Sequence, residues 1–142
     1  MDRIHFVVFG EPQGKARPRV TRYVTYTPKK TMEYEQKIRC AFLTEFDGGF
    51  WDKDIPLDVA IDAFYSIPKS ASKKKSADML ANRILPMKKP DVDNIVKVVL
   101  DALNKTAFHD DAQVVKCTIR KAYSNTPRIE VDIMKVPEED PA

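Results

Sequence analysis

The chain has few cysteines and histidines and no long hydrophobic run. These features argue against a disulfide-bonded, zinc-binding or membrane-spanning protein. Its 142 residues include two cysteines, Cys40 and Cys117, which are far apart and lack metal-ligand spacing. We therefore expect two reduced, buried thiols rather than a disulfide or a zinc site. No apolar stretch approaches the ~20 residues of a membrane-spanning helix, and the residues after Met1 lack a signal-peptide pattern. These shortages favour a cytoplasmic protein that makes no membrane contact.

Apolar residues are nevertheless numerous enough for one hydrophobic core. Hydrophobic residues make up 43% of the sequence and charged residues 32%, which is typical of a soluble globular protein. A length of 142 residues is ordinary for one domain. Because neither an internal repeat nor a linker-like stretch is visible, we expect a single domain that covers residues 1–142.

Positive charge is concentrated in two segments, although the net charge is only +3. One segment runs from Glu11 to Lys30 and the other from Lys69 to Lys89, and in each a single acidic residue faces six or seven basic ones. Local basic fields of this kind favour a polyanion as the partner. Two solvated basic loops are an equally good interpretation of charge alone.

Alternating hydrophobic residues predict several strands. Residues Arg3 to Phe9 alternate well, and the stretch from Leu57 to Ile67 alternates over its whole length. A last pair of strands is expected from Val115 to Tyr123 and from Arg128 to Val136. The Asn125-Thr126-Pro127 segment between them predicts the turn that joins this pair.

Helical periodicity appears between these strands. Thr27 is a candidate cap for a helix that runs to about Phe46. A second helix is expected from Asp93 to Asn104, where Ile95, Val99, Ala102 and Leu103 form one apolar stripe. The stretch from Ser70 to Arg83 is compatible with a basic helix or a mobile loop, and Arg22 to Tyr26 with a short strand. This order predicts an α+β fold of two layers, with helices packed on a small mixed β-sheet.

Four aspartates occur in two pairs at the expected starts of a helix and of a strand. Asp91 and Asp93 come first, and Asp93 is a natural N-cap because its carboxylate can accept a backbone N–H at the helix start. Lys97 lies one helical turn after Asp93, within reach of the same site. Asp110 and Asp111 open the strand that follows the helix.

Carboxylates that gather at close range repel one another unless a cation lies between them. Mg²⁺ prefers oxygen ligands, and two such ions roughly 3.5–4 Å apart can clamp a phosphodiester. A neighbouring lysine can stabilise the charge that develops at phosphorus. Taken separately, the same residues are compatible with an ordinary helix cap, a turn and a solvated lysine, and the pattern alone does not bring the second pair to the first.

Together, these segments resemble the RusA family of Holliday-junction resolvases. The resemblance lies in Lys-Pro-Asp-Val-Asp-Asn-x-x-Lys from Lys89, Leu-Asp-Ala-Leu-Asn from Leu100 and Phe-x-Asp-Asp-Ala-Gln-Val-Val from Phe108. The segment from Gly10 to Arg19 is similar to that of phage and prophage relatives. The resemblance implies a homodimeric α+β enzyme that cuts four-way DNA junctions by paired symmetric nicks. It implies Mg²⁺ as the cofactor, with Mn²⁺ as a substitute, and no small-molecule cofactor.

The same resemblance assigns roles to the acidic residues. It places the essential acids on Asp91, Asp93 and Asp111, the catalytic lysine on Lys97, and a further metal ligand on Asp110. The implied reaction is metal-assisted hydrolysis in which water attacks phosphorus and the 3′ oxygen leaves, giving a 5′ phosphate. The basic residues expected to contact the DNA backbone are Lys15, Arg17, Arg19, Arg22, Lys73, Lys74, Lys75, Lys88 and Lys89.

A non-catalytic DNA-junction-binding module, in which the acids are structural, is the main alternative. An aspartyl-nucleophile phosphatase is disfavoured because no apolar strand directly precedes Asp91. A calcium-binding EF-hand loop is excluded because the glycine and closing glutamate are missing. Tyr23 and Tyr26 are expected to pack in the core or sheet, with stacking on an unpaired base as the alternative.

Overall fold

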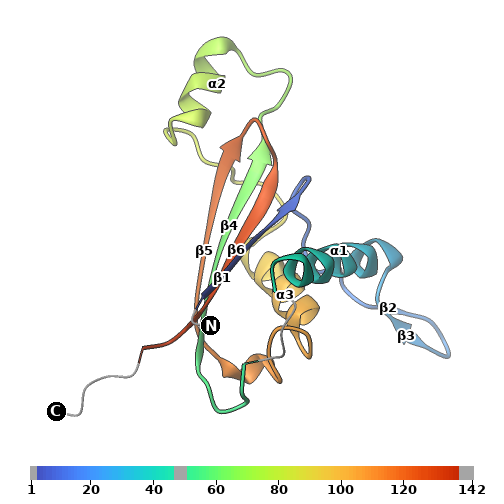
Figure 1. Cartoon of the computed structure of the whole chain (residues 1–142). Helices are drawn as coiled ribbons and strands as arrows, with labels where there is room; N and C mark the ends of the chain where they lie inside the picture. The colour runs from blue at the N-terminus through green and yellow to red at the C-terminus, as the bar shows by residue number, and fades with distance from the viewer. Residues whose placement is uncertain (1–2, 47–50, 138–142) are drawn as a thin grey trace.

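The computed structural model describes residues 3–46 and 51–137, and Figure 1 shows a sheet flanked by helices. A short 3₁₀ turn, Asp111–Gln113, precedes the fifth strand. In chain order the elements are β1 (Arg3–Phe9), β2 (Arg19–Val20), β3 (Thr25–Tyr26), α1 (Lys29–Glu45), β4 (Leu57–Ser66), α2 (Lys73–Leu80), α3 (Val92–Leu103), β5 (Val114–Ser124) and β6 (Arg128–Lys135).

The main sheet is mixed, as predicted, with the strand order β1-β6-β4-β5. Strand β6 pairs antiparallel with both β1 and β4, whereas β4 and β5 run parallel. The prediction that the last two strands form a pair is wrong, because β4 lies between them. A local turn signal predicts where the chain reverses, but it does not predict which strand β6 pairs with after the turn. The strongly alternating strand β4 lies between β6 and β5.

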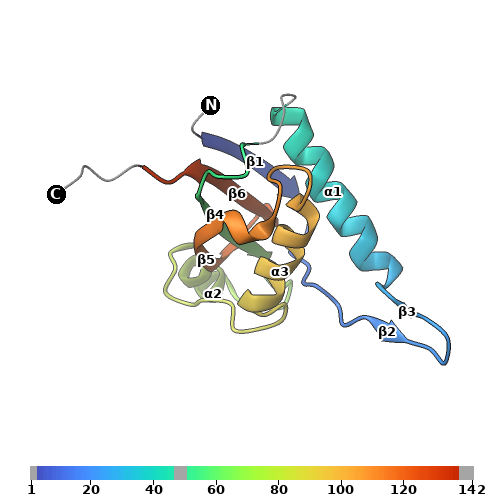
Figure 2. The same cartoon turned by 90° about the horizontal axis from the view of Figure 1, so that it is seen from below.

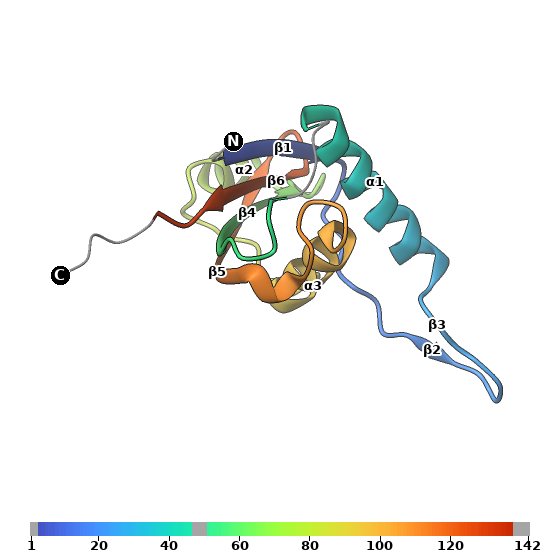
Figure 3. The ribbon, with the colours of Figure 1, turned by 60° about the horizontal axis from the view of Figure 1, so that its bottom comes forward.

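Helices α1 and α3 cover one face of this sheet, as Figures 2 and 3 show. The expected helical stripe of Ile95, Val99, Ala102 and Leu103 is fully buried. The strand residues that face these helices are buried as well: Ile4, Phe6, Val8, Leu57, Val59, Ile61, Ala63, Tyr65, Ile129, Val131 and Ile133. The buried residues of the helices and of the strands pack together between the helical layer and the sheet. The predicted two-layer α+β architecture is therefore confirmed.

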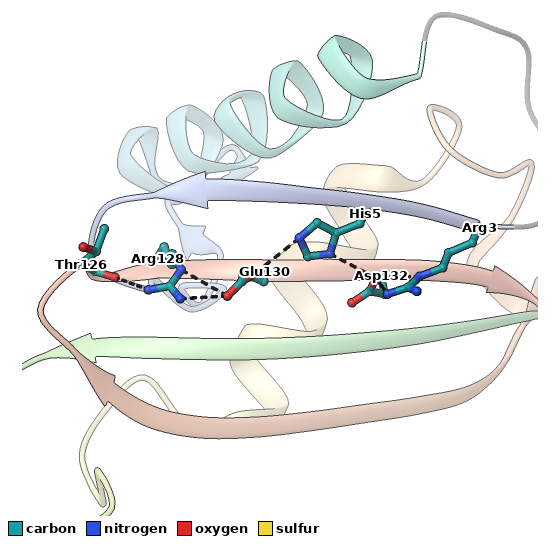
Figure 4. A network of polar contacts seen from close by, with 6 residues as sticks. All are labelled: Arg3, His5, Thr126, Arg128, Glu130 and Asp132. Atoms are coloured by element: carbon teal, nitrogen blue, oxygen red, sulfur yellow. Dashed lines mark hydrogen bonds and ion pairs between the residues drawn. The ribbon is translucent and has the colours of Figure 1, made fainter. Parts of the chain in front are cut away.

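The opposite face of β1 and β6 carries a network of charged side chains, drawn in Figure 4. Asp132 contacts Arg3 at 2.6 Å and the ring of His5 at 3.1 Å. Glu130 contacts Arg128 at 3.0 Å and the other ring nitrogen of His5 at 3.4 Å. Cross-strand pairs of this kind favour the β1–β6 register, and their partial exposure keeps each contribution small.

Several element boundaries differ from the predicted ones for local reasons. Helix α1 has Pro28, not Thr27, at its N-cap position. The stretch from Ser70 to Arg83 contains a true helix, α2, whose cap is the Ser72 side chain. The expected short strand at Arg22 to Tyr26 is instead part of the β2–β3 hairpin. Within the described residues, no helix combines the length and apolar character needed to cross a bilayer.

Some residues expected to be buried are exposed. Both cysteines are free and exposed, because Cys40 lies on the outer side of α1 and Cys117 on the edge strand β5. Val115 is 62% exposed because a register shift at the start of the β4–β5 pairing leaves it without a partner. Tyr23 and Tyr26 are also exposed, so neither packs in the core. Tyr26 does lie in a sheet, the two-stranded one of β2 and β3, whereas Tyr23 lies in the turn between these strands.

Candidate functional site

The start of α3 presents two exposed carboxylates. Asp91, not Asp93, occupies the N-cap position, and its side chain accepts no capping hydrogen bond. Its carbonyl oxygen accepts from the N–H of Ile95 at 3.1 Å, and Asp93 lies in the first turn. The prediction that Asp93 caps the helix is therefore wrong by two residues. The Asp91 carboxylate stays free of a capping contact, at a helix end that favours negative charge.

The backbone before Asp91 is held by side chains from the sheet. Tyr65 Oη donates to the Pro90 carbonyl oxygen at 2.6 Å, and Lys121 Nζ donates to the Lys88 carbonyl oxygen at 2.7 Å. The Lys121 ammonium also lies over the Tyr65 ring, 5.0 Å from its centroid. Burial, and then the nearby charge of Asp91, raises the pKa of Tyr65 to about 12. The hydroxyl therefore stays protonated and able to donate.

A glycine allows the first basic loop to lie against α3. A Cβ built on Gly14 would come within 2.9 Å of the Cβ atoms of both Pro90 and Asn94, so a side chain there would push the two segments apart. The next residue, Lys15, donates its backbone N–H to the Asn94 carbonyl oxygen at 2.9 Å. The loop is thus fixed beside the N-terminus of α3.

Lys15 is a largely buried cation between two carboxylates. Its side chain is 13% exposed, and its Nζ lies 3.1 Å from Glu35 of α1 and 3.2 Å from Asp101 of α3. Burial alone would lower the pKa of Lys15, but its hydrogen bonds and charge pairing with Glu35 and Asp101 outweigh burial and raise it. Although Lys15 was expected among the DNA contacts, its ammonium therefore links the loop to both helices.

A pocket of about 830 Å³ opens between the first basic loop, α1 and the start of α3. It brings Asp91 together with cations from both basic segments of the sequence. The charged side chains in its wall are Lys15, Arg17, Arg19, Lys30, Lys89 and Asp91. A concave surface with this charge suits a phosphate chain, and it leaves a carboxylate beside the path of that chain.

The other expected DNA contacts are not part of the wall of this pocket. Arg22 is in the turn of the β2–β3 hairpin, with its guanidinium over the Tyr23 ring at 5.7 Å. The Lys88 ammonium lies 5.8 Å from the centroid of the Tyr123 ring. Lys73, Lys74 and Lys75 form the exposed first turn of α2, which Figure 1 shows beyond the ends of β4 and β5.

Asp110 and Asp111 form a second acidic pair, at the turn before β5. Asp110 Oδ1 accepts the backbone N–H of Ala112 at 3.0 Å and caps the 3₁₀ turn. That backbone hydrogen bond lowers the pKa of Asp110. The side-chain hydrogen bond to Asp110 raises the pKa of Asp111, with further contributions from burial and from the charges of Asp110 and Asp101. The two neighbouring carboxyl groups therefore differ in acidity, with the pKa of Asp110 lowered and that of Asp111 raised.

Gln113 holds the turn that carries this second pair. Its side-chain oxygen accepts from the N–H groups of His109 and Asp110, at 2.8 and 3.2 Å. Its side-chain nitrogen donates to the carbonyl oxygens of Asp52 and Ile55, at 2.9 and 3.1 Å. The side-chain oxygen and nitrogen of Gln113 therefore make two hydrogen bonds each, and together these bonds hold the turn against the loop before β4.

The four aspartates do not form one cluster in this chain. Across residues 3–46 and 51–137, no group of three or more acidic, histidine or cysteine side chains is arranged to hold a metal ion. Asp91 and Asp93 start α3, whereas the charge of Asp101, in the last turn of α3, acts on Asp111. The donor chemistry still fits Mg²⁺, since one or two carboxylates plus substrate phosphate are its usual ligands, and a cation would relieve the repulsion between the adjacent carboxylates of Asp110 and Asp111.

Sequence reasoning missed the residues that support these aspartates. Tyr65 and Glu35 act through contacts between elements far apart in sequence, and no local pattern marks such contacts. Asp101 and Gln113 lie in motifs that resemble the RusA family, but the ion pair of Asp101 with Lys15 and two of the four Gln113 hydrogen bonds join segments far apart in sequence. Gly14 could have been identified from the rarity of glycine, since the whole chain contains only four.

A family model and one relative indicate the same family. The family model described as "Endodeoxyribonuclease RusA" matches residues 10–134. A Bacillus subtilis (strain 168) protein described as "Uncharacterized protein YqaN" is 36% identical over 142 residues, covering 96% of this chain and 99% of that protein. A Lactococcus phage r1t protein, "Crossover junction endodeoxyribonuclease rusA", is 30% identical over 87 residues, covering 61% of this chain and 60% of that protein.

Proposed function

The chain belongs to the RusA family of endodeoxyribonucleases, and we propose that it resolves four-way DNA junctions by paired symmetric nicks in a divalent-metal-dependent reaction. The observation that supports this most is the basic pocket that contains Asp91. A phosphodiester drawn into the pocket by its cations would come next to the acidic start of α3.

The basic side chains bind and orient the substrate in this proposal. Arg17, Arg19, Lys30 and Lys89 line the pocket from three segments, so they can contact successive phosphates of one strand. Such contacts supply affinity and register rather than sequence choice. The lysines on α2 would extend the same backbone contact along a second arm of the junction.

The aspartates are proposed to hold the metal. Asp91, Asp93, Asp110 and Asp111 supply the hard oxygen ligands that Mg²⁺ or Mn²⁺ prefers. When bound, such an ion would draw charge from the scissile phosphate and make a nearby water more acidic. Because the two pairs form no single group in the described part of the chain, a metal ion held by either pair would take its remaining ligands from substrate phosphate and water.

Lys97 is proposed to stabilise the charge that develops during cleavage. It is exposed on α3, one turn after Asp93. A bond from a water oxygen to phosphorus forms while the bond to the 3′ oxygen breaks, which leaves a 5′ phosphate and a 3′ hydroxyl. Lys97 would pair with the non-bridging oxygens as their negative charge grows.

Two nicks on opposite strands need two active sites. A two-fold homodimer would place one site on each of the symmetry-related strands of a junction. We therefore include a homodimer in the proposal, and an analytical ultracentrifugation run on the free protein would measure it.

The proposal is tested with a four-way junction labelled on each strand in turn. Wild-type protein with Mg²⁺ should give nicks at matching positions on opposite strands, each with a 5′ phosphate, and none in EDTA. Asp93→Asn should bind the junction as wild type does but leave it uncut. Glu45→Gln, which changes an exposed acid at the far end of α1, serves as the matched control and should cut normally.

A non-catalytic junction-binding module is the second candidate, favoured by the lack of a three-ligand group among the described residues. It predicts tight junction binding by the wild-type protein with no nicks at any Mg²⁺ or Mn²⁺ concentration. Cutting by Asp93→Asn at the wild-type rate would instead show that nuclease activity lies elsewhere.

A further inference from the structure

The β2–β3 hairpin projects from the body of the molecule, as Figures 2 and 3 show. Its two short strands pair in the register Arg19 with Tyr26 and Val20 with Thr25. Every residue from Ala16 to Tyr26 is exposed. The hairpin therefore contributes nothing to the core, and its sequence is free to serve another purpose.

The tip is held in one conformation despite its exposure. The backbone N–H of Thr21 donates to the Val24 carbonyl oxygen at 2.7 Å, and the Thr21 hydroxyl donates to the same oxygen at 3.0 Å. The Thr21 hydroxyl oxygen in turn accepts from the N–H of Val24 at 3.0 Å. An ordered tip binds a partner at a smaller cost in conformational entropy than a floppy one.

The hairpin combines exposed apolar surface with positive charge. The exposed fractions are 77% for Val20, 85% for Tyr23, 58% for Val24 and 45% for Tyr26. The Arg22 guanidinium lies over the Tyr23 ring, and the sequence between Glu11 and Glu33 contains no acidic residue. An aromatic face beside an arginine is the combination that stacks on a nucleobase while pairing with its phosphate.

The position of the hairpin connects it to the pocket. Arg17 and Arg19 line the pocket, and the chain runs directly from them into the hairpin tip. A DNA strand held by these arginines would therefore extend towards Tyr23. Bases inside a duplex are already stacked on both faces, whereas a base at a branch point has a face that can be exposed, and an aromatic side chain can cover that face.

From these observations we propose that the tip from Thr21 to Val24 recognises the branch point of a DNA junction, with Tyr23 stacked on an unstacked base and Arg22 on the adjoining phosphate. This inference rests on the proposed function, because it takes branched DNA as the substrate. The phosphate contacts of the pocket do not distinguish a branch point from linear duplex. The hairpin tip is the element proposed to make this distinction.

The inference is tested by binding in EDTA, so that cleavage plays no part. Tyr23→Ala should lower the affinity for a four-way junction about tenfold, in line with the loss of one base-aromatic stack, and leave the affinity for linear duplex unchanged. Tyr23→Phe keeps the ring and should restore the preference for the junction. Phe9→Ala removes a ring that is 61% exposed on β1 and should change neither affinity.

A photocrosslink locates the contact. A junction with 5-iodouracil at the branch point should crosslink to the peptide that contains Tyr23, and the same base placed in the middle of an arm should not. Loss of the branch-point crosslink in Tyr23→Ala, with its return in Tyr23→Phe, supports stacking by this residue.

Three results would overturn the inference. First, Tyr23→Ala could keep the crosslink and the junction preference. Secondly, Tyr23→Ala could lose affinity for the junction and for the duplex equally, which would assign the hairpin to general backbone binding. Thirdly, sedimentation of the free protein could show that Tyr23→Ala changes the assembly state, which would mean that a second copy of the chain covers the tip. A protein that crosslinks as expected but never nicks DNA refutes only the nuclease proposal, and one that nicks without the crosslink refutes only the stacking role.

Discussion

Tyr65 and Pro90 are joined by a 2.6 Å hydrogen bond that ties the start of α3 to the central strand of the sheet. Tyr65 is 2% exposed, and its hydroxyl donates to the carbonyl oxygen of the residue directly before Asp91. The direction in which Asp91 leaves the backbone therefore depends on a residue 26 positions earlier in the sequence.

Tyr65→Phe is expected to slow junction cleavage about tenfold, because small displacements of a reacting group are costly. The loss should fall on kcat at saturating junction, with the junction Kd and the Tm close to wild type. A lower kcat with an unchanged Kd and Tm would show that Tyr65 positions Asp91, because a general structural role would also lower the Tm. Tyr34→Phe, which removes the hydroxyl of the neighbouring buried tyrosine on α1, is the control and should keep the wild-type kcat. Equal falls in kcat and Tm for Tyr65→Phe would contradict the positioning role.

Lys15→Met should destabilise the protein by about 3 kcal/mol, since it leaves Glu35 and Asp101 without their shared cation. Urea unfolding measures this change. Adding Glu35→Gln to Lys15→Met should restore part of the loss, because the residue left behind is then uncharged. Lys29→Met provides the contrast: its exposed pair with Glu33 should be worth less than about 0.5 kcal/mol. Comparable losses for the two lysines would argue against a special role for Lys15.

The sequence predicted the local elements of this fold well, because local periodicity reflects which side of an element is buried. The stripes on β1, β4 and α3 lie as predicted. The strand order could not be predicted in the same way: the turn at 125–127 reverses the chain, but β6 pairs with β1 and β4, which both lie far away in sequence, and not with β5. Non-local pairing depends on the whole sheet, and no short window contains that information.

The candidate site, like the fold, could be predicted only in part from the sequence. Acidic and basic residues could be identified by type and spacing, and the pocket does bring both basic segments to Asp91. What sequence could not supply is which charges are already paired within the protein. Lys15 has the sequence surroundings of a phosphate-binding lysine, yet Glu35 and Asp101 hold its ammonium. Exposed Arg17, in the same loop, remains a predicted phosphate contact.

Alkaline pH is expected to unfold the protein through its two buried tyrosines. Burial raises the pKa of both Tyr34 and Tyr65 to about 12, whereas in an unfolded chain the value is about 10. A raised folded-state pKa for a phenol stabilises the folded state below pH ~10, and this stabilisation is lost as the pH rises towards 12. Tyrosinate absorbance and circular dichroism, followed together, should show a late step that coincides with unfolding. Tyr65→Phe should reduce that step by one tyrosine, and ionisation of both residues near pH 10 in a folded protein would contradict the assignment.

Asp110 and Asp111 are neighbours with separable duties, and substitutions can distinguish them. Asp110 caps the 3₁₀ turn through the Ala112 N–H, so Asp110→Ala should cost about 1 kcal/mol of stability, while Asp110→Asn keeps an acceptor and should cost little. Asp111 makes no part of that cap, so Asp111→Asn should leave the Tm unchanged and abolish junction cleavage with binding intact. A reversed pattern, in which Asp111→Asn unfolds the turn and still permits cleavage, would transfer the catalytic role to Asp110. Circular dichroism melts of the three variants beside a single-turnover cleavage assay distinguish these outcomes, because a cap acts on stability whereas a metal-binding carboxylate acts on the rate.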